Sequence, residues 1–246
     1  MKPYTTYAIM VLAIVIGGDS LLLFGIFLII GPLSIPQWEM EERDALLWDG
    51  LLSLLFFIQH SGMMRSSFRT RLAAILPCRY HPSLYAIASG IALTAVVFYW
   101  MPTQAVVYRI EGLFRLPVRS FCLAAIAGFW WGVRSLDHFD TFGLAPLNTH
   151  LSGRPLRSPD FVVRGPYRWV RHPLYFFVLV LIWSAPDVHS DRLLFNVLWT
   201  LWIVLGAFLE EKDLVTELGE KYRRYQKKVP MLFPWRSPDR KTIKSH

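Results

Sequence analysis

Long apolar runs alternate with short polar connections along the chain, and four of the runs have the length of a membrane span. A span needs about 20 mainly apolar residues, because the hydrocarbon core of a bilayer is about 30 Å thick and a helix rises about 1.5 Å per residue. The four runs cover residues 7–30, 46–64, 84–101 and 118–133. A fifth apolar block, 174–209, is interrupted at Ala185-Pro186-Asp187, which predicts a helical hairpin with arms at 174–185 and 193–209. We therefore predict an all-α integral membrane protein with about six membrane segments, the last two forming the hairpin.

The composition supports a membrane protein. Apolar residues make up 54% of the 246 residues and charged residues only 18%, whereas soluble domains average about 25% charged residues. This shortage of polar surface argues against a soluble enzyme. The abundance of Trp, Phe and Tyr also excludes a disordered chain, because disorder tolerates little apolar surface.

The charges of the polar connections predict the orientation in the membrane. The first connection, 31–49, is mainly acidic, whereas the second, 65–82, carries four arginines and no acidic residue. The connection at 134–173 carries six arginines, and the tail is rich in lysine and arginine. Basic connections prefer the cytoplasmic side, so we predict that both termini are cytoplasmic. The tail from Glu210 to Pro230 has apolar residues at helical spacing, which predicts a cytoplasmic C-terminal helix.

Several local features are better explained by structure than by a ligand. The seven histidines never pair at helical spacing, which argues against a di-iron site. Asp137-His138-x-Asp140 could bind a metal, but a solvated helix end explains it better, so we expect no metal site. Asp19 lies deep in the first run, where we expect a hydrogen bond to another helix. Gly128-x-x-x-Gly132 predicts close packing of two helices. Basic and aromatic residues do not interleave as on nucleic-acid-binding surfaces, so no nucleic-acid partner is expected.

Two stretches near the hairpin could form a binding site together. Residues 164–175 contain three arginines, one histidine and two tyrosines, and Glu210-Glu211 follows the second arm. Taken singly, the first stretch is explained by a positive anchor with interfacial aromatics, and the second by a solvated helix end. Adjacent carboxylates oppose the dipole at a helix C-terminus, so a bound cation would relieve a cost there. Because the hairpin brings the stretches together, we predict a pocket for a ligand with a carboxylate and cationic centres.

The ordered motifs of this half resemble a known superfamily. Arg171-His172-Pro173-Leu174-Tyr175, Glu210-Glu211-x-x-Leu214, Gly219-x-x-Tyr222-x-x-Tyr225 and Val229-Pro230 resemble the C-terminal half of the isoprenylcysteine carboxyl methyltransferase superfamily. These membrane methyltransferases bind S-adenosylmethionine without a Rossmann fold, and the resemblance implies the same cofactor here. It implies cofactor binding by Tyr167, Arg171, His172, Pro173, Tyr175, Glu210, Glu211, Tyr222, Tyr225 and Pro230.

The N-terminal half resembles the small-thiol branch of this superfamily. The run from Phe57 to Arg65, with Gln59-His60-Ser61, and the later Ser83-x-Tyr85 look like the methanethiol S-methyltransferases and the related NnrU-type proteins. This implies methylation of a small thiol, methanethiol to dimethyl sulfide, with Gln59 and His60 at the acceptor. His60 and Arg171 are the catalytic candidates, because His60 could orient or deprotonate the thiol. We expect residues 1–136 to form the acceptor side and 137–246 the S-adenosylmethionine site.

Other functions remain open at this point. The same cofactor serves enzymes that methylate the carboxyl group of a prenylated cysteine or the amine of a phospholipid, so the acceptor could be lipid-like. A non-catalytic NnrU-like membrane protein is a third alternative. For His60 alone, a structural role in an apolar helix is as good an explanation. In every case the chain contacts membrane lipid.

Overall fold

The computed structural model describes residues 3–35, 38–136, 139–153 and 161–237. The chain forms two compact units. The first comprises Met1–Val107, Asp140–Ser158 and His189–Phe195, and the second comprises Tyr108–Phe139, Pro159–Val188 and Asn196–His246. The chain therefore crosses from one unit to the other several times. The predicted division into residues 1–136 and 137–246 has only one crossing.

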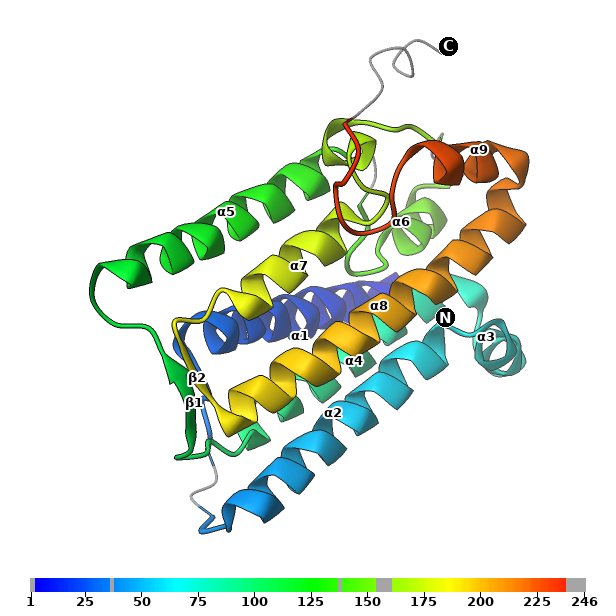
Figure 1. Cartoon of the computed structure of the whole chain (residues 1–246). Helices are drawn as coiled ribbons and strands as arrows, with labels where there is room; N and C mark the ends of the chain where they lie inside the picture. The colour runs from blue at the N-terminus through cyan, green and yellow to red at the C-terminus, as the bar shows by residue number, and fades with distance from the viewer. Residues whose placement is uncertain (1–2, 36–37, 137–138, 154–160, 238–246) are drawn as a thin grey trace. The chain divides into compact units, whose positions relative to one another are not determined.

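The described residues are mostly helical (Figure 1). The elements are α1 (Pro3–Ile30), α2 (Glu42–Met64), α3 (Ser66–Ala73), η1 (Cys78–Tyr80), α4 (His81–Tyr99), β1 (Val106–Arg109), η2 (Gly112–Phe114), α5 (Arg115–Arg134), α6 (Ala145–Ser152), η3 (Gly165–Arg168), α7 (Pro173–Trp183), β2 (Asp187–His189), α8 (Ser190–Leu218) and α9 (Glu220–Lys228). Each of the six predicted apolar segments is a helix. The short two-stranded sheet of β1 and β2 was not predicted.

Four helical stretches are long and apolar enough to cross a membrane. They are Pro3–Ile30, Cys78–Tyr99, Gly112–Arg134 and Ser190–Leu218, while α7 is apolar but shorter. Their exposed side chains are largely Leu, Ile, Val, Phe and Trp, which suits contact with lipid. The chain is thus an integral membrane protein.

In the first unit, α4 packs against both α1 and α2. Gly90 of α4 allows the close approach to α1, because a Cβ there would lie 2.9 Å from the carbonyl oxygen of Ile16. A buried aromatic cluster joins Phe27, Trp100 and Phe195, with ring centroids 5.1–5.7 Å apart. These contacts hold the apolar helices together by packing, since lipid gives no hydrophobic driving force between them.

In the second unit, α5 packs against α7 through two glycines. A Cβ at Gly132 would lie 2.6 Å from Leu174, and one at Gly128 would overlap the ring of Phe177. The predicted role of this glycine pair in close helix packing is confirmed.

Side-chain contacts show that α7 and α8 run antiparallel. Trp183 Nε1 donates to Thr200 Oγ1 over 2.9 Å, and at the other end of α7 the Tyr175 hydroxyl donates to Glu210 over 2.8 Å. Gly219, with φ at +58°, ends α8 and leads into α9. The predicted tail helix is therefore two helices with a glycine turn between them.

Two local predictions have different outcomes. Asp19 is exposed on α1, and its carboxylate has no hydrogen-bond partner among the described residues. The prediction of a hydrogen bond from Asp19 to another described helix is therefore wrong. Asp137 and His138 lie outside the described residues. Asp140 caps α6 instead, because its carboxylate accepts the amides of Leu144 and Ala145 over 2.7 and 2.8 Å. The described part of the chain contains no group of three His, Cys, Asp or Glu side chains that could hold a metal.

Candidate functional site

A buried ion pair between Arg171 and Glu211 forms the centre of the second unit's polar site. Arg171 Nε donates to Glu211 Oε1 over 2.5 Å, and Nη2 donates to Oε2 over 2.8 Å. Both side chains are only 10% exposed. The remaining nitrogen, Nη1, donates to the carbonyls of Gln226 and Val229. The arginine fork therefore uses all three nitrogens inside the protein.

The Glu211 carboxylate accepts further hydrogen bonds from three other side chains. Gln226 Nε2 donates over 2.8 Å, the Tyr222 hydroxyl over 3.3 Å, and His172 Nε2 lies 3.3 Å away. These donors come from α9 and from the residue before α7. A buried carboxylate is tolerated only when it is paired and its lone pairs are satisfied, and both conditions hold here.

Backbone contacts fix the tail to the start of α7. The amides of Arg171 and His172 donate to the carbonyls of Pro230 and Met231 over 2.9 and 3.0 Å. The Tyr225 hydroxyl donates to the carbonyl of Tyr167 over 2.5 Å. Pro173 begins α7, where its missing N–H costs nothing. Arg171 and His172 lie before the helix, so their backbone amides can donate to carbonyls of the tail.

An apolar cluster lies on one face of α9. Tyr222, Tyr225 and Val229 are buried and pack against partly buried residues of α8 and of the segment before η3. Burial raises the pKa of both tyrosines, and the charge of Glu211 raises them further. Burial, and then the charge of Glu210, raises the pKa of Tyr167 to about 12. All three phenols therefore stay protonated near neutral pH, and those of Tyr222 and Tyr225 donate to Glu211 and to the carbonyl of Tyr167.

Glu210 differs from its neighbour Glu211, because its side chain is 45% exposed. The Tyr175 hydroxyl donates to it over 2.8 Å, and His172 Nδ1 lies 3.6 Å away. The rings of His172 and Tyr175 stack, with centroids 5.3 Å apart and planes 7° from parallel. Glu210 is thus an open carboxylate beside an aromatic stack, and this is a suitable partner for a cationic ligand group.

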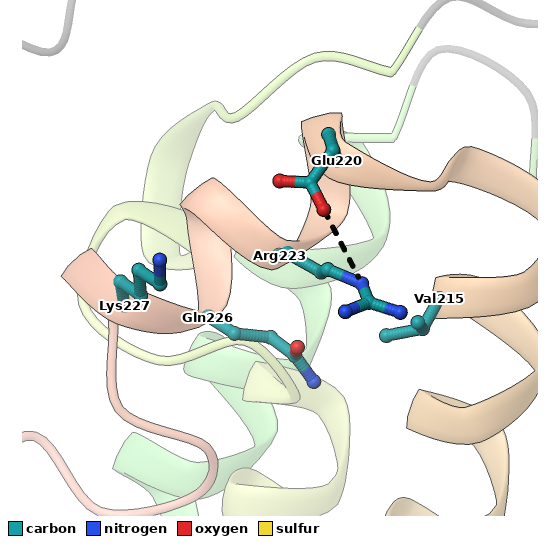
Figure 2. Close-up of a pocket in the computed structure, with 5 residues that line it drawn as sticks. All are labelled: Val215, Glu220, Arg223, Gln226 and Lys227. Atoms are coloured by element: carbon teal, nitrogen blue, oxygen red, sulfur yellow. Dashed lines mark ion pairs between the residues drawn. The ribbon is translucent and has the colours of Figure 1, made fainter.

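The polar face of α9 forms a separate groove of about 420 Å³ (Figure 2). It is lined by Val215, Glu220, Arg223, Gln226 and Lys227. Gln226 connects the groove with the ion pair, because its amide nitrogen donates to Glu211. Tyr222 and Tyr225 do not line this groove; they belong to the buried face of the same helix.

Arg168 is a site residue that sequence analysis did not single out. Its side chain is half-buried, and its Nε has no partner among the described residues. Arg171 is committed to Glu211, whereas the buried Nε of Arg168 is a donor that the described residues leave unfilled. The signal in the sequence was three arginines in one short stretch, without any indication of which would be paired.

The predicted acceptor residues lie in the first unit, and all ten predicted cofactor residues lie in the second. Tyr85 OH lies 2.8 Å from His60 Nε2, and Ser89 Oγ lies 3.2 Å from Nδ1. Gln59 Nε2 lies 3.0 Å from Met63 Sδ, and its buried Oε1 has no partner among the described residues. His60 is therefore held between α2 and α4 by two hydroxyls of α4.

Comparison with known proteins decides the family. The chain is 36% identical over 198 residues to the methanethiol S-methyltransferase of a Pseudomonas species, and the match covers 78% of this chain and 75% of that protein. It is 31% identical over 203 residues to methanethiol S-methyltransferase 1 of Bradyrhizobium diazoefficiens, covering 80% and 70%. The chain belongs to the methanethiol S-methyltransferase family.

Membership makes the chain a membrane methyltransferase, an enzyme that needs a methyl donor. A further similarity, 28% identity over 215 residues, links it to nurim of Rattus norvegicus and covers 80% of each protein. No protein-family profile and no solved structure matches the chain.

Removing one partner of the Arg171–Glu211 pair should destabilise the second unit, because the other charge is then buried and unpaired. We expect Arg171→Ala to lower the free energy of unfolding by about 3–5 kcal/mol. Denaturant unfolding in detergent measures this change. The control is Arg223→Ala, which breaks an exposed 3.6 Å contact to Glu220 and should cost at most about 1 kcal/mol. Equal losses in the two variants would show that Arg171 is not the stabilising contact.

Proposed function

We propose that this protein transfers the methyl group of S-adenosylmethionine to methanethiol, producing dimethyl sulfide. The supporting observation is the 31–36% identity, over most of both chains, to proteins named for methanethiol S-methylation. The arrangement of charges in the second unit is consistent with this donor, and the His60 cluster in the first unit is consistent with a thiol acceptor.

The charged groups of the second unit fit S-adenosylmethionine, which has one carboxylate and two cationic centres. Glu210, half-exposed beside Tyr175, would accept the cationic groups. Arg168, whose side chain is partly exposed, would take the carboxylate through its guanidinium group. Tyr167, His172, Pro173 and Tyr175 would line the pocket at the start of α7.

In this proposal Arg171 and Glu211 act by holding the pocket, not by touching the ligand. Their mutual contacts leave each with no evident capacity for another strong partner. Tyr222, Tyr225 and Pro230 contribute in the same way, because they anchor the tail against the residues before α7. The catalytic contribution of Arg171 is then one of positioning.

The bound donor supplies a methyl carbon made electrophilic by the adjacent sulfonium. The protein must orient the acceptor, exclude water and remove the thiol proton, since the thiolate is the competent nucleophile. His60 is the proposed base, with Gln59 beside it at the acceptor. Its ring is held by hydroxyls of α4, which fixes its orientation before a thiol arrives.

We assign the acceptor mainly to the N-terminal helices, within residues 1–136, and the cofactor to the part of residues 137–246 that belongs to the second unit. We further propose six membrane segments, formed by α1, α2, α4, α5, α7 and α8, with both termini cytoplasmic. The arginines of residues 65–82 and 134–173 and the basic tail support this orientation.

The reaction can be tested with purified protein, isotope-labelled S-adenosylmethionine and three acceptors: methanethiol, a phospholipid amine and a prenylcysteine. We expect labelled dimethyl sulfide from methanethiol and no labelled lipid. Labelling of a lipid acceptor without any thiol product would overturn the acceptor assignment. Failure to bind S-adenosylmethionine would favour a non-catalytic membrane component.

Glu210→Gln should weaken S-adenosylmethionine binding by about tenfold in Kd, because it removes a charge-assisted contact at a partly exposed position. Titration calorimetry measures the affinity. Glu217→Gln, at an exposed position on the same helix, makes the same chemical change and should leave the Kd unchanged. Equal affinities in Glu210→Gln and the parent protein would remove Glu210 from the site.

The proposed orientation predicts that Cys78, which is exposed, faces the cytoplasm. In a Cys122→Ser background, a membrane-impermeant maleimide should label Cys78 in inverted vesicles and not in intact cells. Permeabilised cells serve as the positive control. Labelling in intact cells would reverse the orientation.

A further inference from the structure

The first unit contains a mainly apolar cavity of about 650 Å³. Its wall is built from the end of α2, from α3, from the start of α4 and from residues 140–143. The apolar part of the wall includes Met63, Met64, Phe68, Leu72 and Ala73. Pockets of about 300–1,000 Å³ with such linings are typical of sites for small organic ligands.

The wall also carries titratable groups, and most of these have other roles. His81 Nε2 lies 3.0 Å from the carbonyl of Leu76, and the Asp140 carboxylate caps α6. Arg69 and Cys78 are exposed residues of the wall. Tyr85 is the remaining titratable residue of the wall, and its hydroxyl contacts His60 behind the wall.

Tyr85 connects the cavity with His60, which does not line the cavity itself. The Tyr85 hydroxyl lies 2.8 Å from His60 Nε2, and His60 Nδ1 lies 3.2 Å from Ser89 Oγ. If Nδ1–H donates to Ser89, then Nε2 is the acceptor of the Tyr85 proton. A phenolic oxygen that donates its own proton can still accept a hydrogen bond. A thiol in the cavity can thus pass its proton to Tyr85 while Tyr85 passes its own to His60.

We propose that this cavity is the acceptor site, that Tyr85 transfers the thiol proton to His60, and that the site takes alkane- and arenethiols larger than methanethiol. This rests on the proposed function. The S–H bond breaks as the proton moves to the Tyr85 oxygen, and the Tyr85 proton moves to His60. The thiolate sulfur then bonds to the donor methyl carbon, and the carbon–sulfonium bond breaks. His60 finally releases the proton to water, which balances the reaction.

The size of the cavity is the reason for the broader acceptor range. Methanethiol has one carbon and one sulfur, so it fills only a small part of 650 Å³. A butyl or phenyl group would bury more of its surface against the apolar wall, and each buried methylene should strengthen binding about fourfold. Affinity should therefore rise from methanethiol to butanethiol or benzenethiol.

The proton-transfer role is tested with two thiols of different acidity. Benzenethiol is far more acidic than butanethiol, so it is already largely thiolate near neutral pH. We expect Tyr85→Phe to lower kcat/KM for butanethiol about 100-fold and for benzenethiol much less. Raising the pH should restore part of the butanethiol rate. Tyr99→Phe, the same change on the same helix outside the cavity wall, should leave both rates unchanged.

The location of the acceptor site is tested by filling the cavity. Ala73 lines the cavity, and the next residue, Ala74, does not. Both are exposed, so Ala74 is a matched control position. Ala73→Trp should lower kcat/KM for benzenethiol relative to methanethiol by about tenfold, and Ala74→Trp should not. Fluorine NMR of fluorothioanisole, a methylated product, should show binding to the parent protein and to Ala74→Trp but not to Ala73→Trp.

The outcomes separate this proposal from the proposed function. If the parent protein methylates no thiol, both fail. If it methylates methanethiol but neither larger thiol, the assignment of this cavity is wrong. Equal losses on both thiols in Tyr85→Phe, with unchanged S-adenosylmethionine affinity by calorimetry, would make Tyr85 structural.

Discussion

The buried ion pair of Arg171 and Glu211 is the interaction on which the second unit depends. A carboxylate near the end of a long apolar helix is costly unless several donors surround it. Here Arg171 donates twice, and Gln226, Tyr222 and His172 complete the set. Because these donors come from the start of α7 and from α9, satisfying one charge fixes three helices against one another.

This requirement also explains why two adjacent glutamates have different environments. Neighbouring residues on a helix point about 100° apart, so two consecutive side chains do not face the same partners. Glu211 faces the donors of α9 and is almost fully buried, whereas Glu210 is half-exposed beside Tyr175. One carboxylate stabilises the fold, and the other keeps capacity for a ligand.

The first unit satisfies its polar groups by the same rule. His60 of α2 meets Tyr85 and Ser89, which are four residues apart and so lie on one face of α4. Asp191, at the start of α8, accepts hydrogen bonds from Trp100 and Thr103. In each case a polar side chain in an apolar region has its partner on a neighbouring element. The helices are therefore held in register by hydrogen bonds as well as by packing.

The hydrophobic pattern by itself determined that the long apolar segments are helices, because a chain in lipid must satisfy its backbone hydrogen bonds within each segment. It also predicted the contact of Gly128 and Gly132 with another helix. It did not predict α3 and α6, which lie in the polar connections. It did not locate the helix break at Gly219, which comes from the positive φ of one glycine and leaves the apolar period unchanged. It could not determine the pairing of β1 with β2, since that depends on contacts between segments far apart in the chain.

The motifs likewise determined which residues gather around the hairpin, because their order is fixed along the chain. Only the tertiary structure decided how their charges are used. The sequence does not distinguish among the three arginines or between the two glutamates. A buried charge requires a full set of hydrogen bonds, and in the structure Arg171 and Glu211 have such a set. Likewise, only folding makes Tyr85 both a wall residue of the first unit's cavity and a partner of His60, because that role depends on how α2 packs against α4.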